Sequence, residues 1–159
     1  MEHAEHTVTV ATSVDLVWEI LLDVEGYAKI FPPTQDVELL ESSAEHQVAR
    51  LTVRVNDEVQ SWVSRRDIDP RRRVIAYRQV ETLPIVGYMG GEWRALTVDQ
   101  ATTQLVLTHD FEISAVVNGK VAGKYLPPEA EALVRSAVEH NSVADLAAVK
   151  DEAERRARG

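Results

Sequence analysis

Alternation of apolar and polar residues dominates the first two-thirds of the chain and predicts a sheet. Residues 5 to 11 read EHTVTVA, and six later runs alternate in the same way: DVELLE, QVARLTVRV, EVQSWVSRRDI, RVIAYRQVE, GGEWRALTV and TQLVLTHDFEI. Short alternating runs separated by turn signals are typical of antiparallel strands with one buried face. Asn56-Asp57 and Asp69-Pro70 suit the turns between them. The pattern therefore predicts seven strands arranged as an antiparallel meander.

Helical spacing replaces alternation directly after the first of these strands. Ser13 is a suitable N-cap for the segment VDLVWEILLDVEGYAKIF, whose apolar residues recur at helical intervals. Gly26 is expected to divide this segment into two short helices, and Pro32-Pro33 to end the second. Residues 114 to 126 contain two glycines and no clear period, so we expect a loop there.

A long helix is predicted at the end of the chain, from Pro127 or Pro128 to about residue 155. Glutamates in its first turn and Arg155-Arg156 in its last complement the helix macrodipole at both ends. One face is predicted to carry Ala130, Val134, Ala137, Val138, Asn141, Ala144, Asp145 and Ala148, and the opposite, solvent-exposed face Arg135, Glu139, Ser142 and Lys150. The small alanines leave room for a ligand between helix and sheet. We therefore expect an α+β fold, a sheet curled around this helix.

Composition sets the class of protein. The 159 residues suit one domain covering residues 1–159, and 45% hydrophobic residues exclude a disordered chain. A net charge of −9 argues against a nucleic-acid partner, and no apolar run is long enough to cross a membrane. The chain has no cysteine, and its first residues show no secretory signal. A cytoplasmic protein that does not enter the membrane is the expectation.

Basic residues nevertheless cluster locally, at Arg65, Arg66, Arg71, Arg72 and Arg73. We favour a solvated hairpin turn for this cluster. The alternative is a patch that docks an acidic partner protein despite the overall negative charge.

The alternation of side chains along a strand places the adjacent Arg65 and Arg66 on opposite faces of the sheet. Gln60, Trp62, Ser64 and Arg66 share one face of their strand, and Arg65 belongs to the other. In the last strand His109 shares a face with Leu105, Leu107 and Phe111. A lone inward histidine is more often a hydrogen-bonded core residue, and a lone inward arginine a structural ion pair. Arg66, His109 and Asp145, however, come from three elements that this architecture brings together, and they form a candidate acid–base site.

Other signals are weaker. Trp62, Tyr88 and Trp93 line an apolar pocket or belong to an ordinary core, and the core is slightly favoured for each. The stretch GYMGG reads as a bulged or sharply bent strand. The five histidines have no metal-ligand spacing, and no phosphate or dinucleotide motif is present. We expect no metal and no cofactor.

Three stretches carry a family resemblance: SWVSRRDIDPRRRVIAYRQVETLPIVGYMGGEWRA, TQLVLTHDF and NSVADLAAV. They resemble the aromatase/cyclases of bacterial type II polyketide pathways, in particular the ZhuI type, within the START-like helix-grip superfamily. The pattern W-x-S-x-R followed by R-x-V-E-T is fairly specific to these enzymes. The resemblance implies a seven-stranded antiparallel sheet around a long C-terminal helix, with a deep pocket. It also implies first-ring aldol cyclisation and aromatisation of a linear poly-β-ketone on an acyl carrier protein, in concert with a minimal polyketide synthase.

The resemblance also implies roles for single residues. The family's catalytic arginine, histidine and aspartate match Arg66, His109 and Asp145. Tetracenomycin-type members carry glutamine at the position of His109, so this chain groups with cyclases that join carbons 7 and 12 rather than 9 and 14. Arg66 is expected to hold a developing enolate or alkoxide, His109 to move protons, and Asp145 to orient His109 or deliver a proton. The expected substrate-binding residues are Trp62, Ser64, Tyr88, Trp93 and Asn141.

Two other functions stay open on the sequence. One is a non-catalytic carrier or sensor for a hydrophobic small molecule, because the same fold binds lipids, hormones and quinones. The other is a scaffold that shields a chain while it cyclises spontaneously. Three ionisable groups in one cavity favour the enzyme, since an apolar carrier has no use for them.

Overall fold

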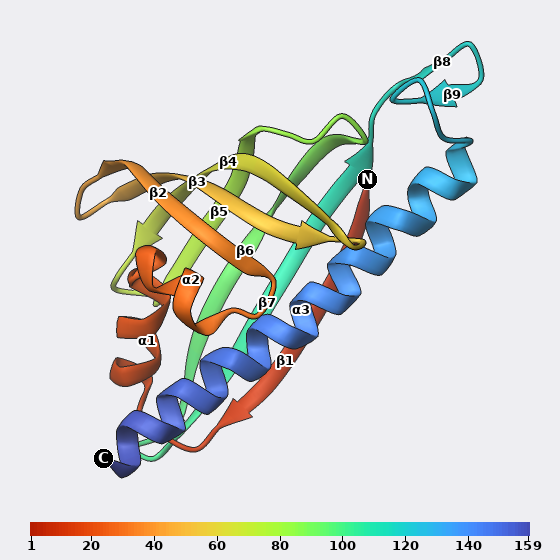
Figure 1. The fold of residues 1–159 in the computed structure, drawn as a ribbon. Helices are drawn as coiled ribbons and strands as arrows, with labels where there is room; N and C mark the ends of the chain where they lie inside the picture. Colours follow the sequence, from red (N-terminus) through yellow and green to blue (C-terminus); the bar gives the residue numbers. More distant parts are fainter.

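A computed structural model describes residues 1–159 and contains one large, strongly curved antiparallel sheet (Figure 1). Its seven strands are β1 (Glu2–Val10), β2 (Thr34–Ser42), β3 (His46–Val55), β4 (Glu58–Asp69), β5 (Val74–Glu81), β6 (Val86–Asp99) and β7 (Thr102–Ile113). They are arranged in the order β1-β7-β6-β5-β4-β3-β2. Neighbours in the sequence are thus neighbours in the sheet from β2 to β7, and β1 pairs with β7. The predicted seven-stranded meander is confirmed.

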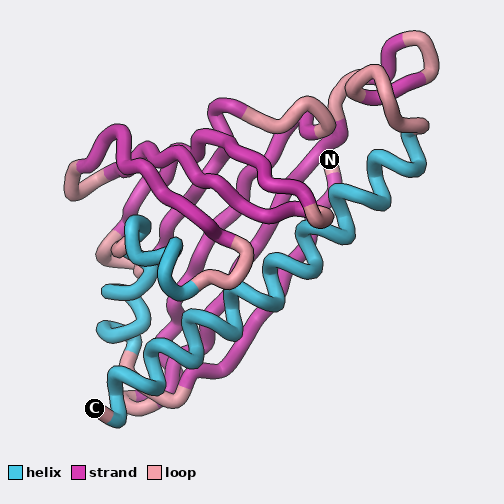
Figure 2. Tube along the Cα trace, in the orientation of Figure 1, coloured by secondary structure: helices cyan, strands magenta, loops and turns pink.

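The helices lie on the concave side of this sheet. After β1 come α1 (Val14–Leu22), a 3₁₀ turn η1 (Val24–Gly26) and the single-turn helix α2 (Tyr27–Ile30). The helical segment is divided as expected, but the backbone leaves the helical region at Asp23, whereas Gly26 keeps helical dihedral angles. The long helix α3 (Pro127–Arg158) crosses the sheet diagonally, and Figure 2 shows it as one unbroken rod. None of the helices has the length and apolarity that crossing a bilayer requires.

The core forms where helices and sheet meet. Seventeen buried apolar residues gather between α1, the sheet and the C-terminal half of α3, among them Val17, Ile20, Ile75, Leu105 and Val149. A separate cluster of six buried apolar residues lies beneath the N-terminal half of α3. The two clusters are distinct because the space between helix and sheet is not filled along its whole length.

The segment after β7 differs from the predicted loop. Residues Val116–Val117 (β8) and Lys120–Val121 (β9) pair as a small antiparallel hairpin that projects beside the start of α3 (Figure 1). Asn118 and Gly119 both have positive φ, which closes a tight two-residue turn. Two pairs of residues are too short to show a period, so the pattern could not reveal them.

The buried face of α3 also differs from the prediction. Its buried residues are Ala130, Val134, Val138, Ser142, Leu146, Val149 and Ala153. The buried stripe is therefore rotated relative to the predicted one, and Ser142, which we assigned to solvent, is 0% exposed. Alanines occur on several sides of this helix, so the apolar contrast that should orient it is weak.

Gly91 in β6 occupies a position that tolerates no side chain. A Cβ atom there would lie 1.9 Å from the carbonyl oxygen of Thr108 and 2.7 Å from the hydroxyl of Tyr77. We expect Gly91→Ala to lower the free energy of unfolding by about 3 kcal/mol, the upper end for overpacking. Chemical denaturation measures this loss of unfolding free energy. Gly119→Ala is the control, because its added methyl meets nothing within 4 Å and adds only backbone strain, about 1–2 kcal/mol. Equal losses in both variants would contradict the steric account.

Candidate active site

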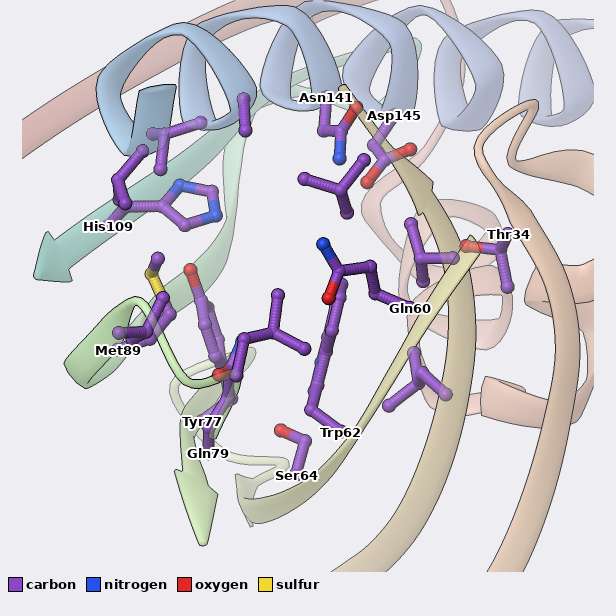
Figure 3. A pocket seen from close by; sticks show the side chains of 18 of the residues that line it. Thr34, Gln60, Trp62, Ser64, Tyr77, Gln79, Met89, His109, Asn141 and Asp145 are labelled. Atoms are coloured by element: carbon purple, nitrogen blue, oxygen red, sulfur yellow. The ribbon is translucent and has the colours of Figure 1, made fainter. Parts of the chain in front are cut away.

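A cavity of about 360 Å³ separates the concave face of the sheet from α3. It is lined by 28 residues, of which 18 are hydrophobic, so polar groups are few and each is conspicuous. Figure 3 shows side chains from β4, β5, β7 and α3 pointing into it from all sides. Apolar walls with a small number of convergent polar groups are typical of small-molecule sites.

Most residues predicted for the site do line this cavity. They are Arg66, His109 and Asp145, together with Trp62, Ser64, Trp93 and Asn141. Tyr88 does not: its side chain is on the outer face and it is 38% exposed. The pairing of β6 with β7 is regular from Tyr88 to Thr97, and Tyr88 is five residues from the inward Trp93, so the two side chains lie on opposite faces and Met89 takes the inward position. Assigning both aromatic residues to the pocket was inconsistent with this alternation. The predicted irregularity at GYMGG is confirmed, because the register shifts between Val86 and Tyr88.

The cavity has a closed end and an open end. At the closed end, Tyr27 in α2, Phe31 directly after α2 and Arg66 on β4 line it and are buried. At the other end the lining residues Asn56 and Glu58 are exposed, in the turn between β3 and β4. The loop between β5 and β6 and Tyr125, just before α3, complete this rim. A ligand therefore enters between these turns and extends toward Arg66.

Arg66 is fixed at the closed end and is 4% exposed. One terminal nitrogen, Nη1, donates to the hydroxyl of Tyr27 at 2.7 Å, and Nη2 donates to the carbonyl oxygen of Leu21 at 2.5 Å. That carbonyl belongs to the last turn of α1, where the helix leaves acceptors unsatisfied and favours a cation. The Nε of Arg66 is buried without a partner. Arg66 thus stabilises the end of α1 and still has a free donor.

Asp145 reaches the cavity from α3, as Figure 3 shows. It forms no ion pair, and its Oδ1 is buried without a hydrogen-bond partner. Burial raises the pKa of this carboxyl from 3.8 to about 8, because nothing compensates the charged form for lost hydration. At neutral pH Asp145 is therefore largely protonated and able to donate a proton. The expectation that it orients His109 has no support in the hydrogen bonds, since the partner of His109 is a different residue.

His109 projects from β7 beneath α3. Its Nδ1 lies 3.3 Å from the hydroxyl oxygen of Ser142, and its ring packs edge-on against Tyr77. Burial, followed by the nearby charge of His6, lowers the pKa of His109 to about 4. The imidazole is therefore neutral at pH 7 and able to accept a proton. A neutral histidine and a protonated aspartic acid thus lie in one cavity, and the carboxyl has the reverse of its usual charge state at pH 7.

Two tyrosines belong to the site and were missed by the sequence analysis. Tyr27 accepts the bond from Arg66 and donates to the carbonyl of Leu21 at 2.5 Å. Tyr77 donates to the carbonyl of Thr108 at 2.6 Å. Burial raises the pKa of both phenols, with partial compensation from Arg66 at Tyr27. The inward parity of Tyr77, which shares a face of β5 with Ile75, was the available signal; Tyr27 had none, because it lies in the irregular segment after α1.

The predicted basic patch is remote from the opening. Arg71, Arg72 and Arg73 lie in the turn between β4 and β5, and the open rim lies at the opposite end of β4. The twelve residues of β4 make eleven steps of about 3.3 Å, so the two ends are about 36 Å apart along the curved strand. Arg73 pairs with Asp15 at 2.5 Å, and the solvent-facing Arg65 pairs with Asp67 at 3.1 Å. Only Arg71 and Arg72 remain free, as in a solvated turn.

Comparison with known proteins identifies the family of this chain. The model of a family described as "Polyketide cyclase / dehydrase and lipid transport" matches residues 1–154. The actinorhodin polyketide synthase bifunctional cyclase/dehydratase of Streptomyces coelicolor is 34% identical over 151 residues, covering 95% of this chain and 44% of the relative. The granaticin counterpart of Streptomyces violaceoruber is 30% identical, covering 94% and 43%. The chain thus spans less than half the length of these two relatives.

A solved structure matches over almost the full length of both chains. The crystal structure of the ZhuI aromatase/cyclase from Streptomyces sp. R1128 is 62% identical, covers 99% of this chain and 96% of its own, and superposes with a TM-score of 0.97. A START superfamily protein from Mycobacterium smegmatis, 18% identical with a TM-score of 0.71, shares the fold. The helix-grip architecture predicted from the resemblance is confirmed. The chain belongs to the polyketide cyclase/dehydrase and lipid transport family.

Proposed function

We propose that this protein is an aromatase/cyclase that closes and aromatises the first ring of a linear poly-β-ketone by intramolecular aldol condensation and loss of water. The observation that carries the proposal is the meeting of a fixed guanidinium, a neutral imidazole and a protonated carboxyl in one largely apolar cavity. A carrier for an apolar ligand gains nothing from burying these groups, since each costs solvation free energy.

Each group has a role in this chemistry. A methylene between two ketones is already acidic, and neutral His109 is suited to remove its proton. The guanidinium of Arg66, which lines the closed end of the cavity, is suited to stabilise the negative charge on an enolate or alkoxide oxygen. Asp145, protonated at neutral pH, is suited to give a proton to the hydroxyl group that leaves as water. Condensation with dehydration is redox-neutral, so the sequence of steps consumes no oxidant or reductant.

The shape of the cavity supports a folded, elongated substrate. Trp62 and Trp93 provide flat apolar walls, while Ser64 and Asn141 supply hydrogen-bonding groups between the rim and the closed end. We propose closure between carbons 7 and 12, the regiochemistry that the family resemblance implied from the histidine at position 109. The walls set how far the chain enters before it bends, which decides the carbons that meet.

Reconstitution tests the function directly. A minimal polyketide synthase that makes carrier-bound poly-β-ketone is supplied with this protein at one-hundredth of the concentration of the carrier. We expect many turnovers per molecule and one dominant first-ring product. A shielding scaffold would act only at stoichiometric concentration, so loss of the effect at this ratio contradicts the enzyme and favours the scaffold.

The substrate's carrier is expected to dock at the rim, on a tether that reaches the cavity. Lys120 and Lys124 lie in and beside the β8–β9 hairpin, and Lys124 stacks over the ring of the rim residue Tyr125 at 5.1 Å. Both lysines are exposed and outside every ion pair of the structure. Their charge suits an acidic carrier protein.

Charge reversal distinguishes this site from the remote patch. We expect Lys120→Glu with Lys124→Glu to raise KM for carrier-bound substrate several-fold and to weaken its salt dependence. Arg71→Glu with Arg72→Glu is the matched control and leaves KM unchanged. Steady-state kinetics at two salt concentrations measure both. If instead the arginine double variant raises KM and the lysine double variant does not, the carrier docks at the turn between β4 and β5.

A further inference from the structure

Behind His109 lies a set of polar groups that the proposed chemistry has not used. Ser142, fully buried on α3, is 3.3 Å from His109 Nδ1. One turn away on the same helix, Glu139 accepts a 2.5 Å bond from His6 Nε2 on β1. His6 Nδ1 is buried and has no partner. Hydroxyl, carboxylate and second imidazole therefore lie together between β1, β7 and α3.

Strand pairing brings the two histidines together. In the β1–β7 register His6 is opposite Leu107 and Ala4 is opposite His109, so the histidines are diagonal neighbours on one face of the sheet. Such positions are roughly 7–8 Å apart, which is close enough for their charges to interact. The side chain of Glu139 is 65% exposed, whereas that of His6 is 17% exposed. Glu139 thus contacts His6 from the solvent side, and on the cavity side His6 contributes to lowering the pKa of His109.

The orientation of the His109 ring makes this arrangement relevant to the reaction. Figure 3 shows one ring nitrogen directed toward α3 and the other toward the middle of the cavity. Since Nδ1 is the atom beside Ser142, Nε2 is the atom that meets the substrate. A neutral imidazole carries a proton on only one of its two ring nitrogens. The hydrogen-bond partner of one nitrogen decides whether the proton lies there or on the other nitrogen. An Nδ1 proton leaves the Nε2 lone pair free to act as a base.

We propose that Ser142 and the His6–Glu139 pair form a positioning network that sets the proton state of His109: Ser142 accepts the Nδ1 proton, and the pair adds to the effect of burial in keeping the imidazole neutral. This inference rests on the proposed function for its catalytic consequence, but not for its effect on His109 itself. The ionisable groups around His109 are His6 on β1, Tyr77 on β5, Asp110 on β7, and Glu139 and Asp145 on α3.

The first test needs no substrate. Nitrogen-15 NMR of the histidine side chains in the free protein reports the tautomer and the titration of His109. We expect wild-type His109 to carry its proton on Nδ1, Ser142→Ala to shift the population toward Nε2, and His6→Gln to move the midpoint of protonation to higher pH. His6→Gln keeps a donor for Glu139 and removes the charge. An unchanged tautomer in Ser142→Ala and an unchanged midpoint in His6→Gln would overturn the network.

The second test measures the steady-state kinetics of the same variants. Loss of a residue that orients a reactive imidazole is expected to lower kcat about 10- to 100-fold in Ser142→Ala, by analogy with partners that orient metal-bound histidines. KM should stay within about two-fold, because Ser142 does not line the cavity. In His6→Gln the acid limb of the pH–rate profile moves upward with the NMR midpoint. Glu131→Gln, an exposed change on α3, is the control and alters neither reading.

Outcomes of the two tests separate the claims. If the NMR shifts occur and no variant, including wild type, turns over substrate, the network stands and the proposed function fails. If wild type turns over and Ser142→Ala matches it in kcat and tautomer at an equal melting temperature, the network fails and the function stands.

Discussion

Replacing Arg66 with alanine is expected to lower the cyclisation rate on the order of a hundredfold, the cost of losing one donor to a developing oxyanion. The reason is the position of the guanidinium: it is buried at the closed end of the cavity, and its Nε has no protein partner. Arg66→Lys keeps the charge but lacks the planar fork, so a partial loss is expected. Single-turnover kinetics on carrier-bound substrate measure both variants.

The same substitution also removes a structural contact, so a control is needed. Arg66 and Gln47 satisfy neighbouring carbonyl groups at the end of α1, those of Leu21 and Leu22. Gln47→Ala leaves one of these carbonyls unpaired, yet Gln47 lies outside the cavity lining. We expect it to lower the melting temperature and leave the products unchanged. If Gln47→Ala slows cyclisation as much as Arg66→Ala does, the effect of Arg66 is structural.

Replacing Asp145 with asparagine is expected to remove a large pH dependence of stability. The pKa of Asp145 is about 8 in the folded state, whereas the ordinary pKa of an exposed aspartate carboxyl is 3.8. The folded state therefore holds a proton that the unfolded state releases, so this residue lowers stability progressively as pH rises from about 4 to about 8. At about 1.4 kcal/mol per pKa unit, the loss at pH 7 is on the order of 4 kcal/mol.

Denaturation at pH 5 and pH 8 tests this prediction. Wild type is expected to lose more stability between these values than Asp145→Asn, which carries no titrating group at this position. Asp151→Asn, a change at an exposed carboxylate on the same helix, is the control and should follow wild type. Parallel curves for wild type and Asp145→Asn would mean that the carboxyl is ionised and solvated, and its role as a proton donor would fail. A stabilised but slower Asp145→Asn would show activity maintained at the expense of stability.

Regular alternation predicted much of the fold and part of the site. Trp62, Ser64 and Arg66 were placed correctly because β4 has no irregularity in its pairing with β3. Tyr88 was placed wrongly because alternation was not applied to it: β6 pairs regularly with β7 from Tyr88 to Thr97, and Tyr88 lies an odd number of positions from the inward Trp93. Ser142 failed because α3 has alanines on several sides. A strong local periodicity predicts which face of an element a side chain occupies, and a weak periodicity does not.

Contacts between distant segments could not be predicted at all. The bonds from Arg66 to Leu21 and Tyr27 join β4 to the helical segment after β1, across 45 and 39 residues. The pairing of His6 with Glu139 spans 133 residues. Neither has a local signature, since each residue alone is an ordinary member of its element. The remoteness of Arg71 to Arg73 from the rim likewise follows from where the cavity opens, which only the packing of α3 decides.

The most direct test of the central claim is the structure of the first ring formed when carbon-13-labelled precursors are supplied to the reconstituted pathway. Wild type, Arg66→Lys, His109→Ala and Asp145→Asn are compared with a reaction that lacks the protein, after each variant is shown to fold. With wild type we expect one ring, closed between carbons 7 and 12. The three variants should shift toward the mixture formed without the protein. If all folded variants give the wild-type ring at the wild-type rate, the cavity acts by shape alone and its ionisable groups are not catalytic.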